Sequence, residues 1–75
     1  MGDGTARIML IKRSFSLSGH RTSVALEPAF WDVLATIAQA RDRSVAALVV
    51  EIDSDRAAVQ PLASALRVFA LQNRG

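Results

Sequence analysis

Apolar and polar residues alternate with a period of two on either side of Ser18-Gly19. Before this dipeptide the alternation runs through Phe15 and Leu17, and after it through Val24 and Leu26. Alternation of this kind is typical of a strand with one buried face, and a Ser-Gly pair between two such runs favours a tight turn. The pattern therefore predicts a β-hairpin within residues 8–26.

The two faces of this hairpin follow from parity, because a two-residue turn at either Ser18-Gly19 or Gly19-His20 pairs odd-numbered residues of one strand with even-numbered residues of the other. The apolar face is expected to carry Phe15, Leu17, Thr22, Val24 and Leu26. The opposite face is expected to carry Lys12, Ser14, Ser16, Arg21, Ser23 and Ala25. Arg13 falls on the apolar side, so we expect it at the sheet margin with its charged head in water.

Three stretches with helical periodicity follow the hairpin. The first is predicted over residues 28–41, because Pro28 suits a first helical turn, where its missing N–H would be unpaired anyway. Ser44 is a good N-cap for a second helix that ends within residues 53–56, and Pro61 begins a third that reaches about Gln72. The three apolar stripes are Phe30, Val33, Leu34, Ile37 and Ala38; Val45, Leu48, Val49 and Ile52; and Leu62, Ala65, Leu66, Phe69 and Ala70.

The chain is expected to form one domain of the α+β class, mainly α. It has 75 residues, 51% of them hydrophobic, which allows one core and argues against general disorder. Residues 1–6 show no periodicity and are expected to be a disordered tail, which leaves residues 7–75 as the single domain. Domains this short bury only ~60% of the surface that the unfolded chain exposes, so oligomerisation is expected to complete the core.

Positive charge is concentrated near the N-terminus. The net charge is only +2, but residues 1–26 hold four cations against one acid, a net +3, whereas residues 27–56 are net −3. The N-terminal third is therefore the part that is expected to face an anionic partner.

The sequence argues against catalysis and against a cofactor. Its only His, His20, lies at the hairpin turn, where little could orient it as a base, and there is no Cys. Asp53 and Asp55 point to different sides of a helix, so they are interpreted as a solvated helix end rather than a carboxylate pair. No metal-ligand spacing and no glycine-rich phosphate loop are present. The protein is not expected to be an enzyme.

The chain is also expected to be soluble and cytoplasmic. Its longest uninterrupted aliphatic run, residues 46–50, is too short to span a bilayer. Residues 8–11 are too short for the apolar region of a signal peptide, and the lack of Cys fits a reducing compartment.

Two groups of residues allow more than one interpretation. The serines of the hairpin, Ser14, Ser16, Ser18 and Ser23, could be phosphorylation sites, ordinary solvent-facing residues or contacts to a nucleic acid. Trp31 could stack on a base, but its place in the apolar stripe of a helix favours the core or a subunit interface.

Several of these segments together resemble the ribbon-helix-helix domains of the Arc/MetJ superfamily. The resemblance is closest to a bacterial subgroup of small proteins and covers about residues 12–71. It rests on Lys12-Arg13-Ser14, then on the run from His20 to Ser23, and on Leu26-Glu27-Pro28-Ala29-Phe30-Trp31. Arg43-Ser44-Val45 opening a helix and the tail Ser64-Ala65-Leu66-Arg67-Val68-Phe69 complete it.

The resemblance implies an intertwined homodimer in which residues 21–26 pair with the same strand of a second copy. The resulting ribbon would enter the major groove of double-stranded DNA, with Arg21 and Ser23 contacting bases. Phosphate contacts would come from Lys12, Arg13, His20, Arg43 and Ser44. The dimer core would hold Val24, Leu26, Phe30, Trp31, Leu34, Ile37, Leu48, Val49 and Ile52.

Two departures from the minimal family pattern keep a second function open. Ala25 stands where many members carry a polar, base-reading side chain, and the leading strand and third helix lie outside the minimal fold. The favoured hypothesis is a dimeric transcriptional regulator, with higher assembly on DNA as a further expectation. The alternative is an adaptor or antitoxin-like module that uses the same dimeric core and binds a protein through its C-terminal helix.

Overall fold

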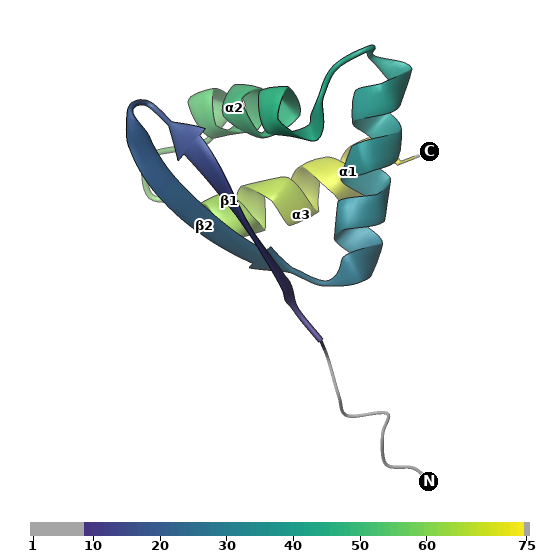
Figure 1. The fold of residues 1–75 in the computed structure, drawn as a ribbon, viewed down its shortest axis with the longest axis horizontal. Coiled ribbons are helices and arrows are strands. Elements are labelled where there is room, and N and C mark those ends of the chain that lie inside the picture. Colours follow the sequence, from purple (N-terminus) through teal and green to yellow (C-terminus); the bar gives the residue numbers. More distant parts are fainter. Residues whose placement is uncertain (1–8, 75) are drawn as a thin grey trace, which may run out of the picture.

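The computed structural model describes residues 9–74, which form a two-stranded antiparallel hairpin followed by three helices (Figure 1). This is the mainly helical α+β order that the periodicity predicts. The expected disordered tail, residues 1–6, lies outside the described residues. None of the helices described here is long and apolar enough to cross a membrane.

The hairpin consists of β1 (Ile11–Leu17) and β2 (His20–Leu26). Its register pairs Leu17 with His20 next to the turn and Ile11 with Leu26 at the open end. Ser18 has φ 52° and Gly19 has φ 80°, both in the left-handed region. A two-residue turn with both φ angles positive matches the right-handed twist of the flanking strands. The predicted turn and the predicted parity of the two faces are therefore confirmed.

The helices are α1 (Pro28–Ala40), α2 (Val45–Asp55) and α3 (Leu62–Asn73). The Ser44 side chain accepts a hydrogen bond from the Ala47 backbone N–H at 3.0 Å, so the predicted N-cap of α2 is confirmed. Pro61 differs slightly from the prediction, because it is the N-cap of α3 rather than its first helical residue.

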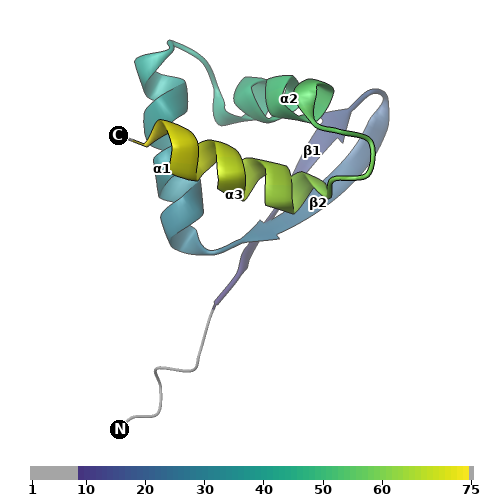
Figure 2. The same cartoon turned by 180° about the vertical axis from the view of Figure 1, so that it is seen from behind.

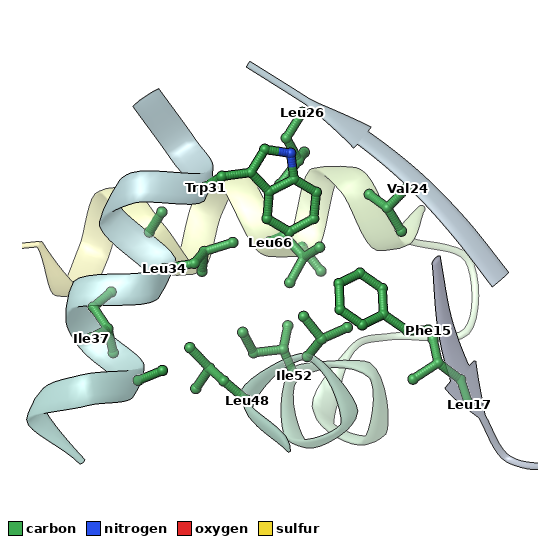
Figure 3. Packing of buried hydrophobic residues seen from close by; sticks show 14 residues of the cluster. Phe15, Leu17, Val24, Leu26, Trp31, Leu34, Ile37, Leu48, Ile52 and Leu66 are labelled. Carbon is green, nitrogen blue, oxygen red and sulfur yellow. The ribbon is translucent and has the colours of Figure 1, made fainter. Parts of the chain in front are cut away.

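The apolar face of the hairpin packs against α2 and α3, and α1 crosses the far ends of these two helices (Figures 1 and 2). Phe15, Leu17, Val24 and Leu26 are buried, as the alternation predicts, and meet the helical stripes in one core (Figure 3). Among residues 9–74, the core holds fourteen buried hydrophobic residues: Phe15, Leu17, Val24, Leu26, Trp31, Leu34, Ile37, Ala38, Leu48, Val49, Ile52, Ala65, Leu66 and Ala70.

Trp31 anchors α1 to the hairpin. Its side chain is 5% exposed, its ring lies 5.9 Å from that of Phe15, and its Nε1 donates to the Ile11 carbonyl oxygen at 2.8 Å. The structural interpretation of this residue is confirmed, since a buried ring with its N–H engaged is not free to stack on a base. The guanidinium carbon of Arg13 lies 5.1 Å from the centre of the Trp31 ring. Arg13 is exposed, in agreement with its predicted position at the sheet margin.

A single chain already covers most of the residues that were expected to form a dimer core. Eight of those nine residues are buried here, and the ninth, Phe30, is half-buried. The reason is that the leading strand and the third helix, which the minimal fold lacks, supply apolar surface within the same chain. Most of these residues are therefore covered within one chain, whereas their part in a dimer core and dimerisation itself stay predictions.

The apolar stripe of α3 is also covered within the chain. Leu66 and Ala70 are buried, and Leu62 and Phe69 are half-buried against the core. This corrects the idea that the stripe is a docking surface for a protein partner, because α3 packs against both α1 and α2.

Leu66→Ala is expected to lower the free energy of unfolding by about 2–5 kcal/mol, because it leaves a cavity at a position with 0% exposure. Val68→Ala, on the exposed side of the same helix, should change it by less than about 0.5 kcal/mol. Urea unfolding followed by circular dichroism measures both. Equal and small effects would mean that α3 is not part of the core.

Candidate nucleic-acid interface

The face of the hairpin that points away from the helices is called the outer face, and it is polar and cationic. Alternation along β1 and β2 places all its side chains on the side opposite the core. All are exposed except that of Ala25, which is half-buried. The face carries two cations and no acidic side chain, as predicted. Its members are Lys12, Ser14, Ser16, Arg21, Ser23 and Ala25.

Two cross-strand hydrogen bonds order this outer face. Ser14 Oγ and Ser23 Oγ lie 3.0 Å apart in directly opposed positions. In the next pair of the outer face toward the turn, Arg21 donates from a terminal guanidinium nitrogen to Ser16 Oγ at 3.4 Å. The structure thus brings both predicted base-contact residues onto one exposed surface, with Lys12 on the same side.

Two of the predicted phosphate-contact residues lie on the other side of the hairpin. Arg13 is paired with Val24, and His20 is paired with Leu17, so both belong to the face that packs on the helices. His20 borders a cleft of about 390 Å³ that Asp53 also lines, next to the turn. A phosphate contact by either residue stays a prediction, and it would have to be made from the sheet margin.

Ser44 is the N-cap of α2 and Arg43 precedes it, and α2 belongs to the helical layer that covers the inner face of the hairpin (Figure 1). A single chain therefore does not place them on the outer face. The Ser44 hydroxyl is engaged as the helix cap, and the Arg43 guanidinium forms an ion pair with Glu51. The sequence did not predict this ion pair, because its two residues are eight positions apart. They come together only because the chain bends before the helix.

A second ion pair connects two segments on which the family resemblance rests. Arg67 Nε of α3 donates to Glu27 Oε1 at 3.0 Å, and the Arg67 guanidinium lies 5.8 Å from the Phe30 ring centre. Glu27 is the residue between β2 and α1. Forty positions separate the ion-paired residues, so no local pattern pointed to the contact. The pair holds the end of the hairpin against α3.

The pKa of Glu27 lies below its ordinary value, first because the Glu27 backbone N–H hydrogen-bonds the carboxylate and second because Arg67 donates to it. A carboxyl group with a lowered pKa in the folded state contributes stability at pH values above its ordinary pKa. That contribution is lost as the pH falls through the lowered pKa. We therefore expect acid to destabilise the fold partly through this group.

In Arg67→Leu the free energy of unfolding should fall less between pH 7 and pH 3 than it does in the wild type. The pKa of Glu27 should rise toward its ordinary value. Denaturant unfolding at several pH values and an NMR titration of the Glu27 carboxyl measure the two effects. Arg74→Leu is the matched control, since it removes a cation of the same kind that has no ion pair within residues 9–74. An unchanged Glu27 titration in Arg67→Leu would contradict the prediction.

Asp53 differs from its interpretation as part of a solvated helix end. Its Oδ1 accepts from Arg56 Nε at 2.8 Å, and Arg56 also donates to the Gln60 carbonyl oxygen at 2.7 Å. The pair closes the loop between α2 and α3. Within residues 9–74 no group of three or more His, Cys, Asp or Glu side chains is placed to hold a metal ion.

Comparison with known protein families gives a match over most of the chain. A family model described as a ribbon-helix-helix domain matches residues 10–73, which is nearly all of the described chain. No curated protein and no solved structure matches the chain.

Proposed function

The chain belongs to the ribbon-helix-helix family, and from this we propose that it is a dimeric DNA-binding protein that regulates transcription. The observation that carries the proposal is the composition of the outer face. Within residues 9–74 it presents two cations and a set of small hydroxyl side chains, with no carboxylate, on an antiparallel pair of strands.

A ribbon of this kind suits the major groove of DNA. Neighbouring strands lie about 4.8 Å apart, so two strands, here β2 and the β2 of a second copy, fit within a groove about 12 Å wide, with β1 of each copy flanking them. Arg21 has enough donors for a bidentate contact to guanine, and the Ser23 hydroxyl is able to donate to or accept from a base edge. Lys12 supplies a charge for the flanking phosphates.

The proposal includes an intermolecular ribbon. Within residues 9–74, β2 has one strand partner, β1, so its other edge is unpaired in the described chain. Antiparallel pairing of this edge with β2 of a second copy would remove the edge and relate the two copies by a two-fold axis. The two copies would then contact two related half-sites on DNA.

The test combines binding with mass measurement. Fluorescence anisotropy with a random-sequence duplex and with a duplex selected from genomic fragments should show binding to both, tighter to the second. Light scattering at micromolar concentration should give about twice the 8.1 kDa chain mass. A protein that binds neither duplex at low salt would overturn the proposal, and a persistent monomer on the selected duplex would overturn its dimeric part.

A protein-interaction adaptor or antitoxin-like module is the second candidate. It is favoured by the low net charge of +2, by Ala25 on the outer face and by the neutralisation of Arg43 by Glu51. Since the stripe of α3 is covered, a protein would have to bind elsewhere. A groove of about 430 Å³ between α1 and the end of α3, lined by Val33, Ile37 and other residues, offers one place. The same duplex titrations distinguish this candidate, because it predicts no preference among DNA sequences.

A further inference from the structure

Each of the two residues that we assign to base contact has its own hydrogen-bonding partner on β1. Ser23 lies opposite Ser14 with the two hydroxyl oxygens 3.0 Å apart, and Arg21 lies opposite Ser16 with a contact of 3.4 Å. Both contacts are exposed, and neither serine belongs to the core. The leading strand therefore does more than cover the core, because it also contacts the side chains that would face the DNA.

The contact with Ser16 restricts the Arg21 side chain. A free arginine on a strand samples many rotamers, and binding a base edge requires most of them to be given up. A hydrogen bond from one terminal nitrogen to Ser16 favours rotamers in which the guanidinium lies across the ribbon, toward β1. It uses one of five N–H donors, so the two donors needed for a bidentate contact to guanine remain available.

The contact with Ser14 determines whether the Ser23 hydroxyl can donate a hydrogen bond to the DNA or can only accept one. Either oxygen could be the donor in this pair. When Ser14 donates, Ser23 keeps its own proton and is able to donate to an acceptor such as guanine O6. When Ser23 donates to Ser14, it presents only acceptor positions to the DNA and fits an amino group on a base. Removal of the Ser14 hydroxyl leaves the orientation of Ser23 unrestricted.

We propose that Ser14 and Ser16 are positioning residues that determine specificity in DNA recognition, Ser14 through Ser23 and Ser16 through Arg21. The inference rests on the proposed DNA-binding function and adds β1 to the part of the chain that determines sequence preference. The two serines act by orienting their partners before DNA is bound, so they raise affinity for the preferred site more than for other sequences.

The experiment compares Ser14→Ala and Ser16→Ala with the wild-type chain on a selected duplex and on a random duplex at several salt concentrations. Each variant should lower the ratio of the two affinities roughly fivefold per half-site, the size expected for the loss of one neutral hydrogen bond, or roughly 25-fold for the dimer. The slope of log affinity against log salt should stay unchanged, because no phosphate contact is removed. Ser54→Ala, at an exposed position of α2, is the matched control and should leave the ratio unchanged.

Two further comparisons separate positioning from a purely structural effect. Ser14→Thr and Ser16→Thr keep the hydroxyl and suit a strand, so they should hold the affinity ratio within about twofold of the wild type. In an Arg21→Ala background, Ser16→Ala should cause no further loss of preference, because the side chain through which it acts is already gone.

The failure of this inference and the failure of the proposed function give different results. If the wild-type chain binds no duplex, the proposed function is wrong and this inference falls with it. If the wild type prefers its selected site and both alanine variants keep that preference, only the positioning role is overturned. A uniform loss of affinity with a shallower salt slope would also overturn it, by making the serines phosphate contacts.

Discussion

Val24→Asp is expected to destabilise the protein strongly. Val24 is 4% exposed and belongs to the same buried core as Phe15 and Trp31 (Figure 3). A carboxylate at this position would lose its hydration without gaining a partner, which costs on the order of 4 kcal/mol or more. The whole stability of a chain of this length is about 4–11 kcal/mol, so the substitution removes a large part of it. Circular dichroism and a urea titration measure the loss.

Ser23→Asp is the matched control for this effect. Ser23 is the neighbour of Val24 on the same strand, but its side chain lies on the outer face and is exposed. The same carboxylate should therefore change the free energy of unfolding by less than about 1 kcal/mol. Comparable destabilisation by the two substitutions would mean that the two faces of the hairpin are not distinguished by burial.

Arg21→Ala and Arg43→Ala are expected to weaken DNA binding in different ways. Loss of a bidentate contact from Arg21 should cost roughly 1–3 kcal/mol on the preferred duplex, about 5- to 150-fold in affinity, and relax base preference at one position in each half-site. Loss of Arg43 should weaken binding to all duplexes equally. It should also reduce the slope of log affinity against log salt by roughly one per phosphate contact, or two for the dimer.

Glu51→Gln adds a test of the ion pair that occupies Arg43. Since Glu51 holds the Arg43 guanidinium in the free protein, its removal should strengthen binding to every duplex and leave base preference unchanged. Titrations of the three variants and the wild type at several salt concentrations measure all these effects. If neither arginine variant changes binding to any duplex, the two assigned contacts are wrong and the adaptor hypothesis is favoured.

Local periodicity predicted most of the fold. The hairpin faces follow from parity about Ser18-Gly19, because each strand is only half-buried. The helices follow from their apolar stripes together with Pro28 and the cap at Ser44. These features depend on residues that are close in sequence, so they are visible before the tertiary structure is known.

The candidate site was predicted less completely, because several of its contacts join residues that are far apart. The exposed positions of Arg21 and Ser23 follow from strand alternation, but the ion pair between Arg43 and Glu51 depends on how the chain turns before α2. His20 also lies on the opposite face of the hairpin from Arg21 and Ser23, since its pairing with Leu17 directs it to the inner side. Pattern alone indicates which side of a strand a residue occupies, and it does not indicate which distant group lies beside it.

Because β1 and α3 supply apolar surface that the minimal fold lacks, a single chain covers its own core. Folding of the chain and assembly of the dimer are therefore expected to be separate steps. In an obligate dimer, dilution releases unfolded chains, and the melting temperature depends on protein concentration. Here dilution should release folded monomers that keep their outer face intact. Under the proposed two-fold assembly, occupancy of a DNA site would then rise with the square of the free monomer concentration. A modest change in the cellular amount of the protein would therefore switch a target gene sharply.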